Sequence, residues 1–88
     1  MEVYYVFAFS ERTESMKFFE RLRKVGVYSA IINTPRATSL GCGLSVRVSP
    51  RNFRAAVSAF RSNEYRSFLG AYEITRAERG SVARRVMS

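Results

Sequence analysis

The residue best equipped for covalent chemistry is Cys42, the only cysteine of the chain, which lies between two glycines in the segment SLGCGL over 39–44. The chain contains no histidine, no aspartate and no tryptophan. Histidine is the usual general base and the commonest metal ligand, so its absence removes most acid/base and metal chemistry. A thiolate acting as a nucleophile is the chemistry that remains.

Two interpretations of Cys42 are open on the residues alone. In the first, Gly41 and Gly43 leave the sulfur sterically accessible and allow backbone N–H groups to point at an anion held on it. In the second, Cys42 is a small hydrophobic residue near the start of a strand, because a free cysteine is among the most buried residue types. The exposure of the side chain decides between them.

The remaining residues offer little support for an enzyme of the usual kinds. The serines have no histidine partner, and the chain has no glycine-rich phosphate loop and no cluster of metal ligands. Glu11, Glu14 and Glu20 follow helical spacing among basic residues, which predicts a solvated face with surface ion pairs. We therefore expect a carrier or binding protein rather than an enzyme, with no cofactor and no metal ion.

Apolar periodicity and turn-forming residues predict the elements that position Cys42. The apolar segment 3–9 favours a strand buried on both faces, and clean alternation over 43–48 favours a further strand. We expect, in chain order, a strand over 3–9, a helix capped by Ser10 or Thr13 and ending at Gly26, a strand over 27–33, a loop over 34–41, a strand over 43–48, a helix opening at Ser49-Pro50 and ending at Ser62-Asn63, a short turn around 65–69, and a strand over 71–75.

This order predicts an α+β fold of the ferredoxin-like class. In this βαββαβ sandwich, a four-stranded antiparallel sheet carries two helices on one face. Residues 1–75 are expected to form a single domain. Residues 76–88 are rich in arginine and are expected to form a basic C-terminal tail that is frayed or weakly helical.

The predicted topology places the Cys42 loop at a defined edge of the sheet. The same edge carries the end of the first strand and the start of the first helix, so Cys42 is expected near residues 10–13, at the positive end of the helix dipole. A helix N-terminus and a nearby arginine both favour the thiolate. Arg36 on the same loop and Arg12 on the neighbouring one are the candidate arginines, while glutamates in the same helical turn oppose them.

The overall charge is strongly basic, and it speaks to partners rather than to fold. The 88 residues carry a net charge of +8, with thirteen arginines and two lysines. Such a surface attracts nucleic acid, acidic proteins and anionic small molecules, or is simply a solvated surface. The lone cysteine excludes an internal disulfide, the apolar N-terminus lacks the basic leader of a signal peptide, and no apolar run reaches membrane-spanning length. We expect a cytoplasmic protein without a membrane partner.

Several short motifs together resemble a small bacterial family described as selenium/sulfur carrier-like proteins. The resemblance runs over roughly residues 3–60. The motifs that carry it are a helix ending in Gly26-Val27, the triplet Thr34-Pro35-Arg36, the segment Ser39-x-x-Cys42-Gly43-Leu44, and the helix opening at Ser49-Pro50.

The resemblance implies that Cys42 carries sulfur or selenium as a persulfide or selenyl-sulfide, between a donor protein and an acceptor protein. Thr34, Pro35, Arg36, Ser39 and Gly43 match the rest of the family's signature. We expect Arg36 and the backbone N–H groups of Gly43 and Leu44 to hold the charged sulfur, with Gly41 as a further residue of the site.

Two alternatives remain open beside the carrier. A four-stranded sheet with two helices is also the architecture of RNA-recognition domains, and the first strand carries Tyr4, Tyr5, Phe7 and Phe9, but the aromatic signature motif of those domains is absent. Core packing is the competing interpretation of these aromatics. In the second alternative, the open face of the sheet forms a homodimer, which is compatible with the carrier.

Overall fold

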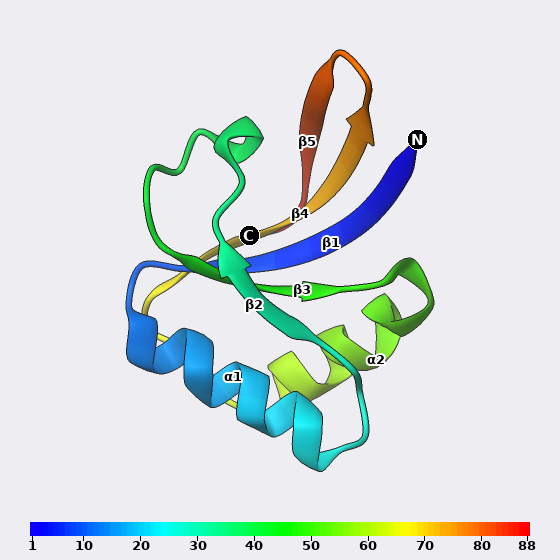
Figure 1. Cartoon of the computed structure of the whole chain (residues 1–88). Coiled ribbons are helices and arrows are strands. Elements are labelled where there is room, and N and C mark those ends of the chain that lie inside the picture. Colours follow the sequence, from blue (N-terminus) through cyan, green and yellow to red (C-terminus); the bar gives the residue numbers. More distant parts are fainter.

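The computed structural model describes residues 1–88. Five strands form one antiparallel sheet, and two α-helices pack on the same side of it (Figure 1). The elements are β1 (Glu2–Phe9), α1 (Arg12–Lys24), β2 (Ala30–Asn33), the short 3-10 helix η1 (Arg36–Thr38), β3 (Leu44–Val48), α2 (Pro50–Arg61), β4 (Phe68–Ala77) and β5 (Gly80–Met87). The predicted α+β class, with two helices on one face of an antiparallel sheet, is confirmed.

The strand order is β2-β3-β1-β4-β5, and every neighbouring pair is antiparallel. The prediction of four strands is wrong, because β5 adds a fifth at the edge beyond β4. Residues 76–88 were expected to form a frayed or weakly helical tail, but they form the end of β4 and the whole of β5. The expected turn around 65–69 is also wrong in part, since β4 already begins at Phe68.

The main core lies between the sheet and the two helices. Alternation along β1 directs Phe7 and Phe9 to this side, where they meet Phe18 and Leu22 from α1 and Ala56 from α2. The ring centroids of Phe7 and Phe18 lie 4.9 Å apart. Packing of aromatic rings from three elements fixes the position of α1 against the end of β1, which is the edge that also carries the Cys42 loop.

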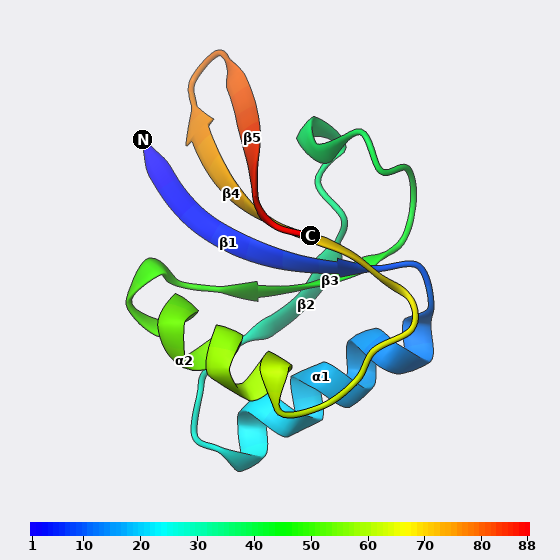
Figure 2. The ribbon, with the colours of Figure 1, turned by 180° about the vertical axis from the view of Figure 1, so that it is seen from behind.

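A second, smaller apolar cluster occupies the opposite face of the sheet. Tyr4, Val6, Tyr72 and Ile74 are buried there, and partly buried Ile32, Leu40 and Ala83 pack against them. Figure 2 shows the β4–β5 hairpin and η1 on this side of the sheet, away from the helices, and η1 contacts β5. We call this side the open face; the homodimer predicted to form on it stays a prediction.

The helix starts differ from the expected caps. The N-cap residue of α1 is Glu11, not Ser10 or Thr13, and its side chain makes no capping hydrogen bond. Ser49 does hold the N-cap position of α2 with Pro50 following, as predicted, but its hydroxyl is buried without a hydrogen-bond partner. Packing of the apolar stripes therefore fixes the helices more than side-chain caps do. Neither helix is long and apolar enough to cross a membrane.

Candidate functional site

The connection between β2 and β3 is a long loop whose two ends are fastened together. The backbone N–H of Thr34 donates to the carbonyl of Gly43 at 2.9 Å, and the Thr34 hydroxyl lies 2.8 Å from the hydroxyl of buried Ser45. A Cβ atom at Gly43 would lie 3.4 Å from the carbonyl oxygen of Phe9. Position 43 therefore lies directly beside the end of β1, where the loop returns to the sheet.

The first half of the loop is held by a 3-10 turn and one buried threonine. The Pro35 carbonyl accepts hydrogen bonds from the backbone N–H of Thr38 at 3.1 Å and from its hydroxyl at 2.8 Å. The Thr38 hydroxyl in turn accepts from the N–H of Leu40 at 3.3 Å, and Leu40 packs on the open-face cluster. Pro35 and Thr38 therefore anchor this part of the loop, while Gly41 and Cys42 beyond Leu40 are exposed.

Cys42 lies in the exposed second half of the loop as a free thiol. Ser39 and Gly41 on its N-terminal side have positive φ angles of 61° and 85°, and no atom would lie within 4 Å of a Cβ at Gly41. These two residues with positive φ change the direction of the chain, and the space around Gly41 is open. The interpretation of Cys42 as a buried, space-filling residue is therefore excluded.

The loop ends beside the start of α1, as the topology predicted. Leu44, the first residue of β3, pairs with Phe9 at the end of β1, and its carbonyl accepts a hydrogen bond from the hydroxyl of buried Ser15 at 3.1 Å. Figure 1 shows the end of the loop next to the connection between β1 and α1. Cys42 thus belongs to a loop that is tied to the first turns of α1.

The acidic residues of that helix start do not form the uniformly solvated face that their spacing predicted. Glu14 is partly buried, and its carboxylate accepts hydrogen bonds from the backbone N–H of Arg66 and from the N–H and hydroxyl of Ser67. The hydroxyl and N–H of Ser67 hold the pKa of Glu14 below its ordinary value. Glu20 pairs with Arg23 on the surface, as expected. The charge of Glu14 is thus engaged by the α2–β4 connection.

Of the predicted binding residues, Arg36 has the most unexpected surroundings. Its side chain lines a hollow on the open face with Tyr4, Arg76 and Ser81, and no ion pair or hydrogen bond engages its guanidinium. Arg36 as a ligand of the Cys42 sulfur stays a prediction. The same holds for Thr34, Pro35, Ser39, Gly41, Gly43 and Leu44, although their backbone and hydroxyl contacts show how they shape the loop.

Sequence reasoning missed two buried hydroxyl residues that stabilise the loop, Ser15 and Thr38. Each lies in a segment where a serine or threonine commonly faces solvent, so spacing alone carried no signal for either. A threonine three residues after Pro35 does fit a short turn in which its hydroxyl bonds back to the proline carbonyl. That local pattern could have singled out Thr38.

The fold and the loop together define a small α+β protein that presents a single free thiol on a surface loop, whose base is closed by hydrogen bonds. The chain belongs to the family described as "Putative Se/S carrier protein-like", whose model matches residues 4–69. The resemblance found in the sequence is thereby confirmed, and the match extends beyond residue 60 into the start of β4. Searches of curated proteins and of solved structures returned no match.

Proposed function

We propose that this protein carries sulfur or selenium on Cys42, on a ferredoxin-like scaffold, between a donor protein and an acceptor protein. The observation that supports this most is the exposure of the only thiol, on a fastened loop, in a chain that belongs to a family named for selenium and sulfur carriage. A nucleic-acid-binding or dimeric module remains the alternative prediction.

The proposed loading step needs only a thiolate and a persulfide. The Cys42 thiolate attacks the terminal sulfur of a donor persulfide, so that a bond forms between Sγ and that sulfur while the donor's sulfur–sulfur bond breaks. The donor leaves as a thiolate, and no external oxidant or reductant is consumed. In unloading, an acceptor thiolate attacks the terminal sulfur and Cys42 leaves as the thiolate; for selenium, a sulfur–selenium bond forms and breaks instead.

The surroundings of Cys42 suit a carrier better than a small-molecule enzyme. Cys42 lines none of the five main hollows of the surface, whereas enzymes usually enclose their substrates in a concave pocket. No second cysteine is present to attack the loaded sulfur and release it as a disulfide. A protruding, solitary thiol can be reached by both a donor and an acceptor protein.

The test is intact-mass spectrometry of the reduced protein during exposure to a small-molecule persulfide. The wild-type chain is expected to gain about 32 Da, one sulfur atom, and to lose it on addition of a thiol reductant. The variant Cys42→Ser should gain nothing. A matched control moves the thiol to another exposed position, Ser58 on α2, in the double variant Cys42→Ser/Ser58→Cys.

Comparison with the relocated thiol separates a specialised site from any exposed cysteine. We expect Cys42 to load at least about tenfold faster than the thiol at position 58, because the proposed site includes backbone N–H groups that would hold a charged sulfur at position 42 and not at position 58. Equal rates of loading and release at the two positions would show that the loop contributes nothing, and the proposal would then be wrong.

A further inference from the structure

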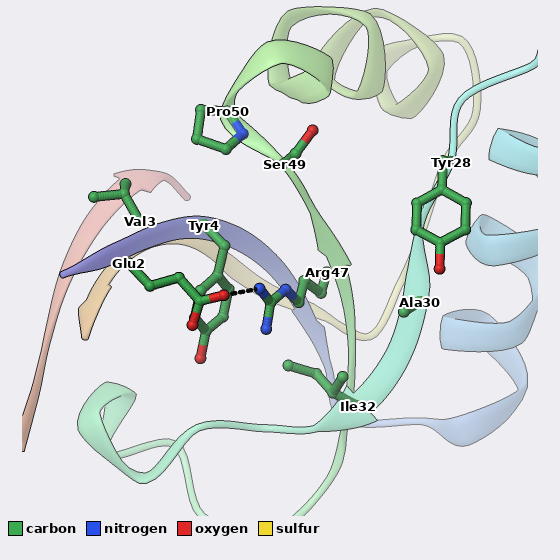
Figure 3. A pocket seen from close by; sticks show the side chains of 9 residues that line it. All are labelled: Glu2, Val3, Tyr4, Tyr28, Ala30, Ile32, Arg47, Ser49 and Pro50. Carbon is green, nitrogen blue, oxygen red and sulfur yellow. Dashed lines mark hydrogen bonds and ion pairs between the residues drawn. The ribbon is translucent and has the colours of Figure 1, made fainter. Parts of the chain in front are cut away.

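The open face carries a groove that the carrier chemistry does not use. It consists of two adjoining hollows, of about 550 and 540 Å³, that meet at Tyr4. Figure 3 shows the residues that line the first hollow. Arg47 lies next to Tyr4, and Ile32 and Tyr28 line the same hollow. The second lies between η1 and the β4–β5 hairpin, with Arg36 on one wall and Arg76 on the other. We call the two hollows together the open-face groove.

The second hollow contains hydrogen-bond donors without a matching anion. Arg36 and Arg76 line it together with Ser81 and Tyr4, and no acidic residue lines it. Arg36 has no ion-pair partner, and Arg76 reaches the Glu2 carboxylate only at 3.8 Å. Two arginines that line one hollow can offer their forked guanidinium donors to the oxygens of a phosphate group.

The first hollow offers a mostly apolar surface next to that charge. The guanidinium of Arg47 lies over the Tyr4 ring, 3.9 Å from its centroid, in a cation–π contact. Ile32 and Ala30 line the same hollow, and Tyr28, 81% exposed, lies at its rim. A guanidinium plane and an exposed aromatic ring are the groups on which planar organic rings stack.

We propose that the open-face groove binds a small organic phosphate that bears a planar ring, such as a nucleoside monophosphate. The phosphate would lie between Arg36 and Arg76, and the ring would stack against Arg47 beside Ile32. The volume of each hollow falls within the range of roughly 300–1,000 Å³ that is typical of small-molecule sites. This site is separate from Cys42 and does not depend on the proposed carrier function.

Glu2 is an internal competitor for this ligand. Its carboxylate pairs with Arg47 at 2.6 Å and lies 3.8 Å from Arg76, and it is the only acidic side chain that lines the groove. An anionic ligand must share these guanidinium groups with Glu2 or displace it. Neutralising Glu2 is therefore expected to strengthen binding, whereas neutralising an arginine of the groove is expected to weaken it.

Part of the groove lies outside the residues that define the family. Glu2, Arg76 and Ser81 all fall beyond the matched span of 4–69. The β4–β5 hairpin supplies one wall, and Arg36 from the family's own segment supplies the other. The site thus combines residues of the segment that matches the family with residues of the β4–β5 hairpin.

The test is a calorimetric or NMR titration of the whole chain with adenosine monophosphate, with inorganic phosphate as a second probe. Arg36→Gln and Arg76→Gln are each expected to weaken nucleotide binding about tenfold, as expected for loss of a charge-assisted contact. Glu2→Gln is expected to tighten it severalfold. The matched control is Arg54→Gln, which removes the same charge from an exposed position of α2 and should change nothing.

Each contrary outcome overturns a defined part of the proposal. If Arg54→Gln weakens binding as much as Arg36→Gln, the attraction comes from the overall charge and not from the groove. If inorganic phosphate binds as tightly as the nucleotide, the first hollow does not hold a ring. If a single-stranded oligonucleotide binds and the mononucleotide does not, the surface binds nucleic acid and the small-molecule site is wrong.

Discussion

The carboxylate of Glu14 accepts two hydrogen bonds of 2.6 Å from Ser67, one from its backbone N–H and one from its hydroxyl, across 53 positions of the chain. The Ser67 carbonyl at the same time accepts the backbone N–H of Ser10 at 2.8 Å. These contacts fasten the α2–β4 connection to the start of α1. The edge of the sheet that carries the Cys42 loop is therefore fixed from two sides, by Ser67 and by the Ser15 contact to Leu44.

Substitution of Glu14 by glutamine should destabilise the fold by about 1–2 kcal/mol, because an amide replaces a charged acceptor of three hydrogen bonds. Urea unfolding followed by circular dichroism measures the change in the free energy of unfolding. Glu64→Gln is the matched control, since Glu64 is exposed and pairs with no other side chain. Equal stabilities of the two variants would contradict the structural role of Glu14.

Stability should fall at acidic pH, and Glu14 should account for part of the loss. Hydrogen bonds from Ser67 lower the pKa of Glu14, and those from Tyr5 and Arg84 lower the pKa of Glu73, below the ordinary value of 4.5. A lowered pKa in the folded state stabilises the fold above pH 4.5, and this contribution is lost as the pH falls through the folded-state value. Unfolding free energies measured between pH 7 and pH 2 should show a shallower loss in Glu14→Gln than in the wild type.

Gly70 should tolerate alanine less well than Gly26 does. Gly70 has a φ of 145°, and a Cβ there would lie 2.8 Å from a terminal nitrogen of Arg85 and 3.2 Å from the Tyr72 ring. Arg85 donates to the Leu69 carbonyl and to the Tyr72 hydroxyl, and these bonds would be disturbed. We expect Gly70→Ala to cost about 2 kcal/mol, from backbone strain and overpacking together.

The matched control for that substitution is Gly26→Ala. Gly26 also has a positive φ, of 80°, but nothing lies within 4 Å of a Cβ at that position. It should cost about 1 kcal/mol, from backbone strain alone. Thermal unfolding of both variants compares the cost of backbone strain with the added cost of overpacking. An equal shift in Tm would mean that the Arg85 side chain moves away from position 70 without destabilising the fold.

β5 should protect alternate backbone amides from hydrogen exchange. Residues 80–87 pair with β4 alone, so only every second N–H of this edge strand can face its neighbour. NMR-detected exchange should therefore show protection with a period of two along β5, and rapid exchange in the turn at Glu78 and Arg79. Uniformly fast exchange over 80–87 would instead indicate the frayed tail that the sequence suggested.

The parts of the fold that were predicted correctly carry clear periodic patterns. β1 is an uninterrupted apolar and aromatic segment, and in β3 the residues Val46 and Val48 face the helices while Ser45 and Arg47 face the open side. The stripe of Phe53 and Ala56 on α2 likewise packs against the sheet. β1 is buried on both faces and is apolar and aromatic over 3–9, whereas β3 and α2 direct their apolar residues to the main core and their polar residues away from it, so the sequence records the geometry directly.

The errors arose where the stabilising contacts join distant parts of the chain. β5 contains Arg84 and Arg85, which suggested a solvated tail, but Arg84 pairs with Glu73 and Arg85 covers the Tyr72 ring. As an edge strand with an exposed side, it shows little apolar alternation. The placement of Arg36 and Arg76 along one hollow depends equally on the path of this hairpin, which no local pattern encodes.

The fastening of Thr34 to Gly43 has a consequence for how a loaded molecule could be recognised. The loop is closed at its base and its outer part is exposed, so one added atom on the sulfur meets no packed side chain and perturbs no core contact. Occupied and vacant molecules would then have nearly the same melting temperature and the same overall shape. A partner could tell them apart only by touching the cargo itself.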